Sequence, residues 1–320
     1  MSLQIATLRE EHLEDAAALV SARYRALRQQ LPILPPRYEQ ADTIVGMLRG
    51  IMGQTDGVVA TRGGRLVGFM TGFVIAEWMG KRTVYSPEWA NGAGLDESRR
   101  VYEEMYRHLS ARWVADGCFL HAVTLMAHDR AGIEGWHWLG FGLVAVDGVR
   151  ELAPVEGNVA EVEVRRAGVA DAREVAALIK ALERHVAAAP TFFIHDLEDP
   201  EEWLRKPGHA LWLAYAGGDP VGCMGLEPGH VGGCEVVQDE ETISVECAFT
   251  REEARGRGVA TALLNQCLEW ARAEGYARCA VDFEAVNVLA VRFWTRWFEP
   301  VCYSLLRWID ERVAPASPVA

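Results

Sequence analysis

The sequence of 320 residues lacks several patterns that define common protein classes. Its seven cysteines form no Cys-x-x-Cys pair, and its nine histidines include no His-x-x-x-His pair with a nearby carboxylate. We therefore expect neither a disulfide framework nor a metal site. The dinucleotide fingerprint G-x-G-x-x-G and the P-loop G-x-x-x-x-G-K-[ST] are also missing, and the second absence argues against nucleotide hydrolysis.

Features of membrane and nucleic-acid proteins are missing as well. No run reaches the roughly 18 apolar residues of a membrane helix, and the N-terminus has no apolar signal segment. A net charge of −13 argues against nucleic acid or an anionic membrane as the partner. An odd number of scattered cysteines indicates reduced thiols in a cytoplasmic protein. The oligomeric state stays open, a homodimer included.

What the chain does contain is one order of elements that runs twice. Half of its residues are hydrophobic, so it can bury a core, and its length suits two domains. In the first half, periodicity predicts strands at 5–8, 58–61, 66–75, 83–89, 119–126 and 143–152, and helices at 11–28, 44–51, 95–115 and 131–139. In the second half, it predicts strands at 162–165, 210–216, 221–226, 242–249, 278–284 and 301–309, and helices at 170–187, 200–204, 259–275 and 288–297.

Local sequence similarity supports a duplication. GRLVGFM at 64–70 is similar to GDPVGCM at 218–224, and the offset is about half the chain. We predict an α/β fold in which each half is a mixed sheet with helices on both faces. The expected boundaries are a first domain at 1–152, a linker at 153–160 and a second domain at 161–320.

A glycine turn lies at the centre of the second half. The strand 242–249 is followed by Arg255-Gly256-Arg257-Gly258 and then by apolar residues at helical spacing. Glycine permits a sharp turn and a close approach of the backbone to a ligand. The first N–H groups of a helix have no internal partner, and the helix dipole makes that end positive. The turn is therefore suited to binding a pyrophosphate, although an ordinary strand–helix connection has the same pattern.

Two motifs at a fixed separation make the prediction more specific. Arg255-x-x-Gly258-x-Ala260 resembles the R/Q-x-x-G-x-G/A signature of the GNAT (Gcn5-related) N-acetyltransferases. Asn287-x-x-Ala290-x-x-Phe293-Trp294 resembles the second conserved segment of that family, N-x-x-A-x-x-F-Y. The resemblance covers about 162–309, and it implies tandem GNAT-like folds if the first half repeats the plan.

The resemblance implies that acetyl-CoA is a co-substrate, with its pyrophosphate on the glycine turn and its pantetheine arm along the strand before it. Asn287 would contact the pantetheine end, and it also suits the N-cap of the helix that follows. The residues expected to bind the coenzyme are Cys247, Ala248, Phe249, Arg255, Gly256, Arg257, Gly258, Val259, Ala260, Thr261, Asn287, Phe293 and Trp294.

The resemblance also points to residues for proton transfer. Glu246 stands where several family members carry a general base, and a half-buried carboxylate suits that role. In an alternating strand it could equally face solvent, and Asp282 and Glu284 on the next strand are the other candidates. Trp294 replaces the usual tyrosine acid, and an indole cannot donate a proton at a useful pKa. The leaving thiolate would take its proton either from water or from another residue, for which Tyr303 is the candidate.

The first half departs from the motif. Asn91-Gly92-Ala93-Gly94 stands where the second half has its turn, and no arginine is present there. Asp96 and Glu97 would lie in the first turn of the next helix and would repel a pyrophosphate. We expect a degenerate copy in the first half.

The predicted function is N-acetyl transfer from acetyl-CoA to an amine of a small molecule or peptide. The alternatives are a non-catalytic protein that binds or senses acyl-CoA, and an assembly role without coenzyme. Residues 185–203, with His185, Phe192, Phe193, His195 and Trp203, are expected to lie near the acceptor, although aromatic residues at such spacing are more often core.

Overall fold

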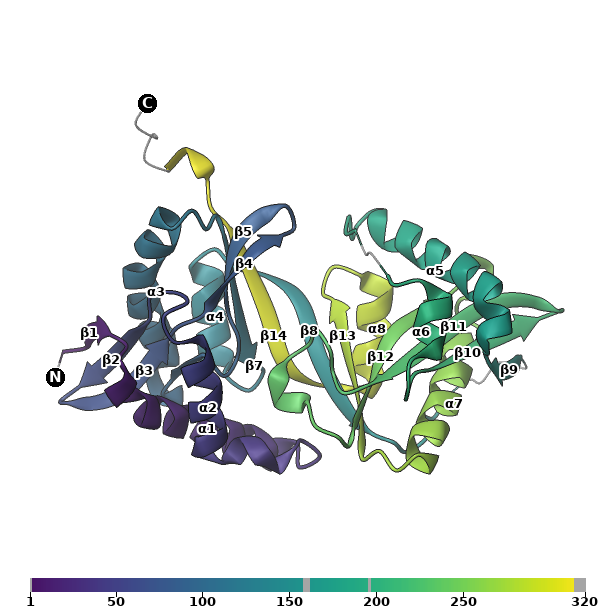
Figure 1. Ribbon diagram of the computed structural model, residues 1–320, viewed down its shortest axis with the longest axis horizontal. Coiled ribbons are helices and arrows are strands. Elements are labelled where there is room, and N and C mark those ends of the chain that lie inside the picture. The colour runs from purple at the N-terminus through teal and green to yellow at the C-terminus, as the bar shows by residue number, and fades with distance from the viewer. Residues whose placement is uncertain (1, 158–161, 195–196, 314–320) are drawn as a thin grey trace. The chain divides into compact units, whose positions relative to one another are not determined.

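The computed structural model describes residues 2–157, 162–194 and 197–313 (Figure 1). The chain forms two compact units that are interleaved in sequence. The first unit takes the described residues of Met1–Val146, Cys234–Val236 and Pro300–Ala320, and the second takes those of Asp147–Gly233 and Val237–Glu299. The predicted boundary near residue 152 differs from this division, because the last strand of the chain lies in the first unit.

The first unit contains two sheets and four helices (Figure 1). One sheet has the order β1 (Gln4–Thr7), β2 (Val58–Arg62), β3 (Arg65–Met70), β6 (Asn91–Ala93), and all its pairs are antiparallel. The other has the order β4 (Phe73–Trp78), β5 (Lys81–Ser86), β7 (Leu120–Met126), β14 (Glu299–Trp308), β8 (Gly142–Glu151). The helices are α1 (Leu13–Gln30), α2 (Ala41–Ile51), α3 (Ser98–Ala115) and α4 (Arg130–Trp138).

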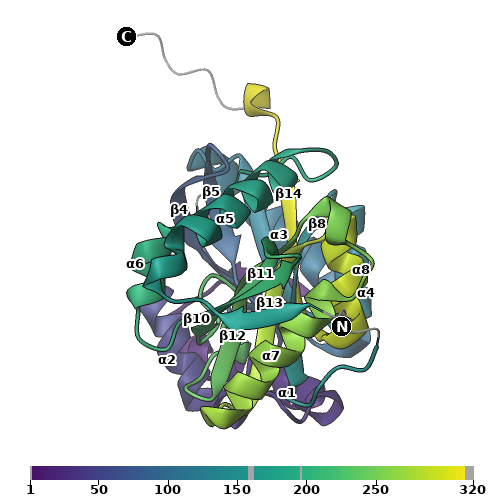
Figure 2. The same cartoon turned by 90° about the vertical axis from the view of Figure 1, so that its right-hand side faces the viewer.

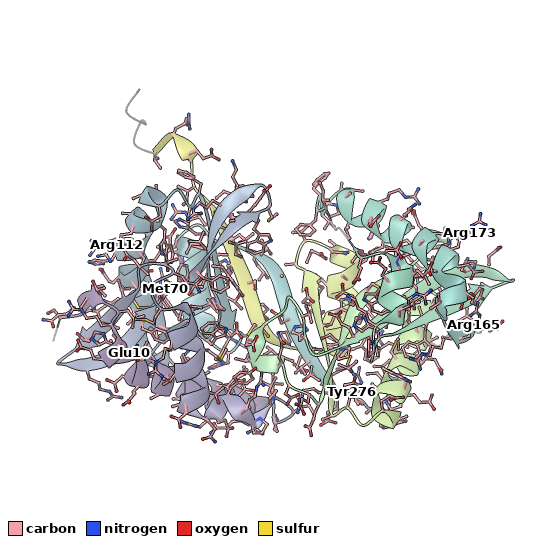
Figure 3. All side chains as sticks on the ribbon, in the orientation of Figure 1. Glu10, Met70, Arg112, Arg165, Arg173 and Tyr276 are labelled. Atoms are coloured by element: carbon pink, nitrogen blue, oxygen red, sulfur yellow. The ribbon has the colours of Figure 1, made fainter. Side chains whose placement is uncertain are left out.

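The core of the first unit forms where α3 and α4 meet the strands. Trp113, Trp136 and Tyr106 are almost fully buried, and Tyr106 stacks edge-on against Trp136 at a centroid distance of 5.2 Å. Met70, labelled in Figure 3, belongs to the same cluster. A Cβ on Gly68 would lie 2.4 Å from Val101 Cγ1, so glycine lets α3 lie close to β3.

The second unit is built on one sheet. Its order is β13 (Arg278–Glu284), β12 (Thr242–Thr250), β11 (Asp219–Pro228), β10 (Ala210–Ala216), β9 (Glu163–Arg166), and residues 147–151 of β8 lie next to β13. Arg165 on the edge strand β9 donates hydrogen bonds of 2.9 and 2.8 Å to the carboxylate of Asp171 (Figure 3). The helices are α5 (Ala172–Ala187), α6 (Pro200–Arg205), α7 (Val259–Ala273) and α8 (Val288–Trp297).

Helices cover both faces of this sheet (Figure 2). On one face, α5 and α6 pack against alternate residues of β11, and the ring of Trp203 lies against Gly225. On the other face, α7 packs so closely that a Cβ on Gly222 would meet Val259 at 3.2 Å. This alternation puts Cys223, Gly225 and Glu227 on the α5–α6 face, since neighbouring strand residues point to opposite faces.

Most predicted elements are confirmed to within a few residues, and the mixed α/β fold class is confirmed. Two predictions for the first half are wrong. The strand predicted at 66–75 is two strands, β3 and β4, in different sheets, because the chain breaks at Gly72, where a Cβ would lie 2.3 Å from the Tyr85 carbonyl oxygen. Residues 91–93 form the strand β6, which pairs with β3, and not a glycine turn.

Candidate functional site

A gap between two neighbouring strands opens the sheet of the second unit. β12 and β13 pair in parallel from Thr242↔Arg278 to Val245↔Val281, and both strands continue beyond this ladder, to Thr250 and Glu284. The opposite side of β12 has a β-bulge, because Val245 pairs with Leu226 and Cys247 with Gly225. Glu246 is the extra residue of the bulge, which bends the strand where β12 leaves β13.

The glycine turn joins β12 to α7 as the sequence predicts. Gly256 and Gly258 have φ values of +71° and +89°, a region that favours glycine. Gly258 is the N-cap of α7, so the N–H groups of Val259, Ala260 and Thr261 begin the helix without partners in an earlier turn. Arg255 donates a hydrogen bond of 3.0 Å to the Thr250 carbonyl oxygen, which fixes this cation beside the turn.

A cavity of about 370 Å³ extends from this turn along the open edge of β12. Its size is that of a small-molecule site. Eleven of the residues predicted to bind the coenzyme line it, and they are Ala248, Phe249, Arg255, Gly256, Gly258, Val259, Ala260, Thr261, Asn287, Phe293 and Trp294. The turn supplies backbone donors at one end, and aliphatic and aromatic side chains form the remaining wall.

α8 forms the wall opposite the turn. Asn287 is its N-cap, since its side-chain oxygen accepts a hydrogen bond of 3.3 Å from the Ala290 N–H. The N-cap prediction is therefore confirmed. The same side chain is 8% exposed and lines the cavity, and its contact with pantetheine stays a prediction. Trp294 is buried and packs edge-on against Phe293 at 4.8 Å.

Two walls of the cavity come from segments that the sequence does not assign to the coenzyme, although it predicts that His185 lies near the acceptor. Leu182 and His185 reach it from α5, and burial, with Arg255 nearby, lowers the pKa of His185. Gly157 of the predicted linker reaches it too. The linker is held by α7, because Val155 N–H donates to Asn265 Oδ1 at 2.7 Å and Asn265 Nδ2 donates back to the Val155 carbonyl oxygen at 3.2 Å.

The candidate base lies outside this cavity. Glu246 and Cys247 line a separate small pocket of about 30 Å³ with Glu198 and Trp203. That volume is enough for a water molecule. Asp282 is exposed on β13; desolvation first, opposed by His230, and then the neighbouring carboxylates raise its pKa to about 6.

Four residues of the predicted site lie outside the lining of the larger cavity. Among the described residues, the lining of the larger cavity does not include Glu246, Cys247, Arg257 or Tyr303. Arg257 is exposed on the turn. Tyr303 pairs with Leu125 on β7 and packs against the core of the first unit. Its prediction as the acid therefore has no support from the cavity.

The aromatic residues of 185–203 divide between two environments. Trp203 belongs to the core of the second unit, whereas Phe192 is 73% exposed. Phe193 lies beyond the end of α5, and its N–H donates a hydrogen bond to the carbonyl oxygen of Val186 within the helix. His195 lies outside the described residues.

The first unit has a strand pair with the same register but no such turn. Gly68↔Ala93 and Met70↔Asn91 repeat the pairing Gly222↔Thr250 and Met224↔Ala248. The register aligns Asn91 with Ala248, so the alignment of 91–97 with the turn 255–260 is wrong. The connection to α3 is only 94–97, whereas the connection from β12 to α7 is 251–258. The residues that form the turn are missing from the shorter connection.

Polar side chains fill the corresponding place in the first unit. Asn91 donates to the Thr124 carbonyl oxygen at 3.1 Å and accepts from Tyr102 Oη at 3.0 Å. Asp129 is the N-cap of α4, and Arg23 Nη2 donates to it at 2.8 Å with both side chains buried. These buried side chains hydrogen-bond to one another at the position that corresponds to Ala248 and its surroundings in the second unit.

The open strands, the glycine turn and the cavity together define the class of acyl-CoA acyltransferase folds. Residues 178–299 match the model of the acetyltransferase (GNAT) family, and this segment belongs to that family. No curated protein matches the chain. The described residues contain no helix that is long and apolar enough to cross a membrane.

Solved structures show the same fold. A GCN5-related N-acetyltransferase from Sphaerobacter thermophilus is similar over 96% of this chain and 96% of its own, with a TM-score of 0.55 and 14% identity. A GCN5-related glucosamine N-acetyltransferase region of a fungal multi-domain β-N-acetylglucosaminidase is similar over 95% of this chain, with a TM-score of 0.52 and 12% identity. This chain spans 38% of that fungal protein. A tandem GNAT protein of clavulanic acid biosynthesis is similar over 99% of this chain, with a TM-score of 0.48 and 16% identity.

Proposed function

We propose that the second unit binds acetyl-CoA and transfers the acetyl group directly to an amine of a small molecule or peptide. The observation that carries this proposal is the cavity that joins the N-terminus of α7 to the opening between β12 and β13. A helix N-terminus preceded by glycines binds phosphate through backbone donors. The adjoining part of the cavity is mostly apolar, as a pantetheine arm requires.

The chain's own residues would bind the coenzyme as follows. The N–H groups of Val259, Ala260 and Thr261 would hold the pyrophosphate, with charge from Arg255 beside them. Ala248 and Phe249 on β12 would offer main-chain groups to the pantetheine arm, because no β13 partner takes that edge in the register. When bound, acetyl-CoA supplies the activated acyl group.

Glu246 is the proposed base for the incoming amine. It stands at the bulge, two residues before Ala248 of the cavity wall, and lines the small pocket beside the cavity, from which it would reach the acceptor amine. Asp282 and Glu284 add negative charge on β13. A protonated amine is attracted to such a group of carboxylates, and loses its proton to one of them before it attacks.

A second function, acyl-CoA binding without turnover, is favoured by one observation. Trp294 is buried in the wall where the family motif has a tyrosine, and its indole N–H cannot protonate the leaving thiolate at a useful pKa. Mixing the protein, acetyl-CoA and a panel of amines, and measuring free thiol, distinguishes the two functions. Thiol release that depends on an amine supports transfer, and saturable binding without release supports sensing.

A pair of glycine variants tests the coenzyme site. Gly258 and Gly218 both have a φ of +89°, so alanine strains the backbone at each, but Gly218 lies in the β10–β11 hairpin. We expect Gly258→Ala to weaken acetyl-CoA binding at least about tenfold, or 1.4 kcal/mol, in isothermal titration calorimetry. Gly218→Ala should retain wild-type affinity. Equal affinities in the two variants would exclude the turn as the phosphate site.

A further inference from the structure

We propose that Glu227 and Glu246 share one proton, so that Glu227 is a positioning residue that holds the carboxylate of the base in place. The pairing of the two side chains is a property of the sheet. Its consequence for acetyl transfer rests on the proposed function of Glu246. Sequence reasoning did not identify Glu227, because it lies in an ordinary hairpin strand with no motif around it.

The β-bulge brings the two side chains together. On β11, Glu227 pairs with Ser244, and Leu226 pairs with Val245. The next pair is Gly225 with Cys247, so Glu246 is inserted between two pairs of the ladder. Without the bulge, Glu246 would stand opposite Gly225, on the same face as Glu227. The bulge keeps the side chain of Glu246 on that face and turns it toward Glu227, its diagonal neighbour.

The contact between the carboxyl groups requires a proton. Glu227 is 9% exposed, and the register places it diagonally next to Glu246, so that the two carboxyl groups come within hydrogen-bond reach of each other. Two ionised carboxylates offer only acceptors, so such a hydrogen bond forms only when one of them is protonated. Two like charges at this distance and in this degree of burial are also strongly unfavourable. The pair therefore carries one proton and one negative charge near neutral pH.

The surroundings place the proton on Glu227. Burial first, and then the charge of Glu246 and the hydrogen bond to it, raise the pKa of Glu227 to about 7. Asp282 acts in the same direction, and the ammonium of Lys206 opposes it. Lys206 is itself held at 2.5 Å by Glu198. The charged groups of the elements packed around the pair are Glu198, Glu202 and Lys206 near α6, and Asp282 and Glu284 on β13.

The pair gives the base a defined state. With its proton on Glu227, the pair presents the ionised oxygens of Glu246, oriented by one hydrogen bond. In the proposed reaction, an ammonium substrate gives one proton to Glu246. The lone pair of the neutral amine nitrogen then forms the N–C bond to the acyl carbon as the C–S bond breaks. The nitrogen loses a second proton, which neutralises the departing thiolate. Loss of the Glu227 proton at higher pH adds a second negative charge and removes the orienting hydrogen bond.

The titration of Glu227 tests the pair without any substrate. Protein labelled with carbon-13 at glutamate carboxyls is titrated by nuclear magnetic resonance, and the signal of Glu227 is assigned through bonds to its own amide. We expect a pKa of about 7 for Glu227 in the wild type. Glu246→Gln should lower it by at least about one pH unit, because the neighbouring charge is gone. Glu202→Gln on α6 is the matched control, and should leave it unchanged.

The catalytic consequence has its own readout. With an amine that is a substrate, kcat/KM of the wild type should change with pH around the pKa of Glu227. Glu227→Gln should abolish that change. Acetyl-CoA binding by Glu227→Gln should match the wild type. A Glu227 pKa in the ordinary glutamate range, or one insensitive to Glu246→Gln, overturns the pair and leaves the proposed function standing. Loss of all acetyl-CoA binding with the expected titration overturns the function and leaves the pair standing.

Discussion

The buried ion pair of the first unit allows a quantitative prediction. In Asp129→Ala, the guanidinium of Arg23 stays buried at 4% exposure without its carboxylate at 2.8 Å. Ser98 Oγ and the Gly132 N–H lose the same acceptor, at 2.7 and 2.8 Å. Breaking one partner of a buried pair costs about 3–5 kcal/mol, because a charge is left uncompensated. We therefore expect a loss of that size in the free energy of unfolding.

Urea denaturation followed by circular dichroism measures this loss. The double variant Arg23→Met/Asp129→Ala should recover part of it, because it removes the unpaired charge. Glu201→Ala, which breaks the exposed pair between Arg205 and Glu201 at 2.6 Å, is the control and should cost at most about 1 kcal/mol. A loss below about 1 kcal/mol in Asp129→Ala, or no recovery in the double variant, would refute the account of a network that fills this slot.

Three further predictions concern the coenzyme and pH. Calorimetric titration with acetyl-CoA should give one site per chain, and a second site would contradict the filled slot of the first unit. Asn265→Ala removes both hydrogen bonds to Val155 and should weaken acetyl-CoA binding about tenfold in calorimetry, whereas exposed Gln266→Ala should not. Burial lowers the pKa of His121 to about 4, below its unfolded value, so as pH falls from about 6.5 to 4 the unfolded chain takes up the proton first. The stability from neutral His121 is present above that window and lost within it, roughly 3 kcal/mol, and urea titrations of His121→Gln should lack this dependence.

The local parts of the site could be predicted from the sequence. The turn around Gly258 is set by residues next to each other in the chain, and Asn287 is marked by the helix that it caps. Walls that depend on distant contacts could not be predicted. Nothing local tells that Val155 is held by Asn265, or that His185 of α5 reaches the slot. Such contacts arise only when the sheet has brought its helices together.

The fold shows the same limit. Alternation along 301–309 identified a strand correctly, but a period of two says which face a residue takes and not which neighbour the strand pairs with. The sequence offers Tyr303 as a substitute for the missing tyrosine acid, but alternation could not show that this residue pairs with Leu125 on β7. In the first half, Asn91–Ala93 kept the glycines of a turn, yet its pairing with β3 made it a strand.

The position of β14 has a consequence for how this polypeptide assembles on the ribosome. Cys302–Trp308 pair with Leu120–Met126, so the first unit is completed by residues that follow the second unit in the chain. Domains usually complete their folding in the order of their synthesis. Here the earlier strands of the first unit must wait, with one edge of β7 unpaired, until the second unit and β14 have been synthesised. A fragment ending after β8 should therefore be prone to aggregate.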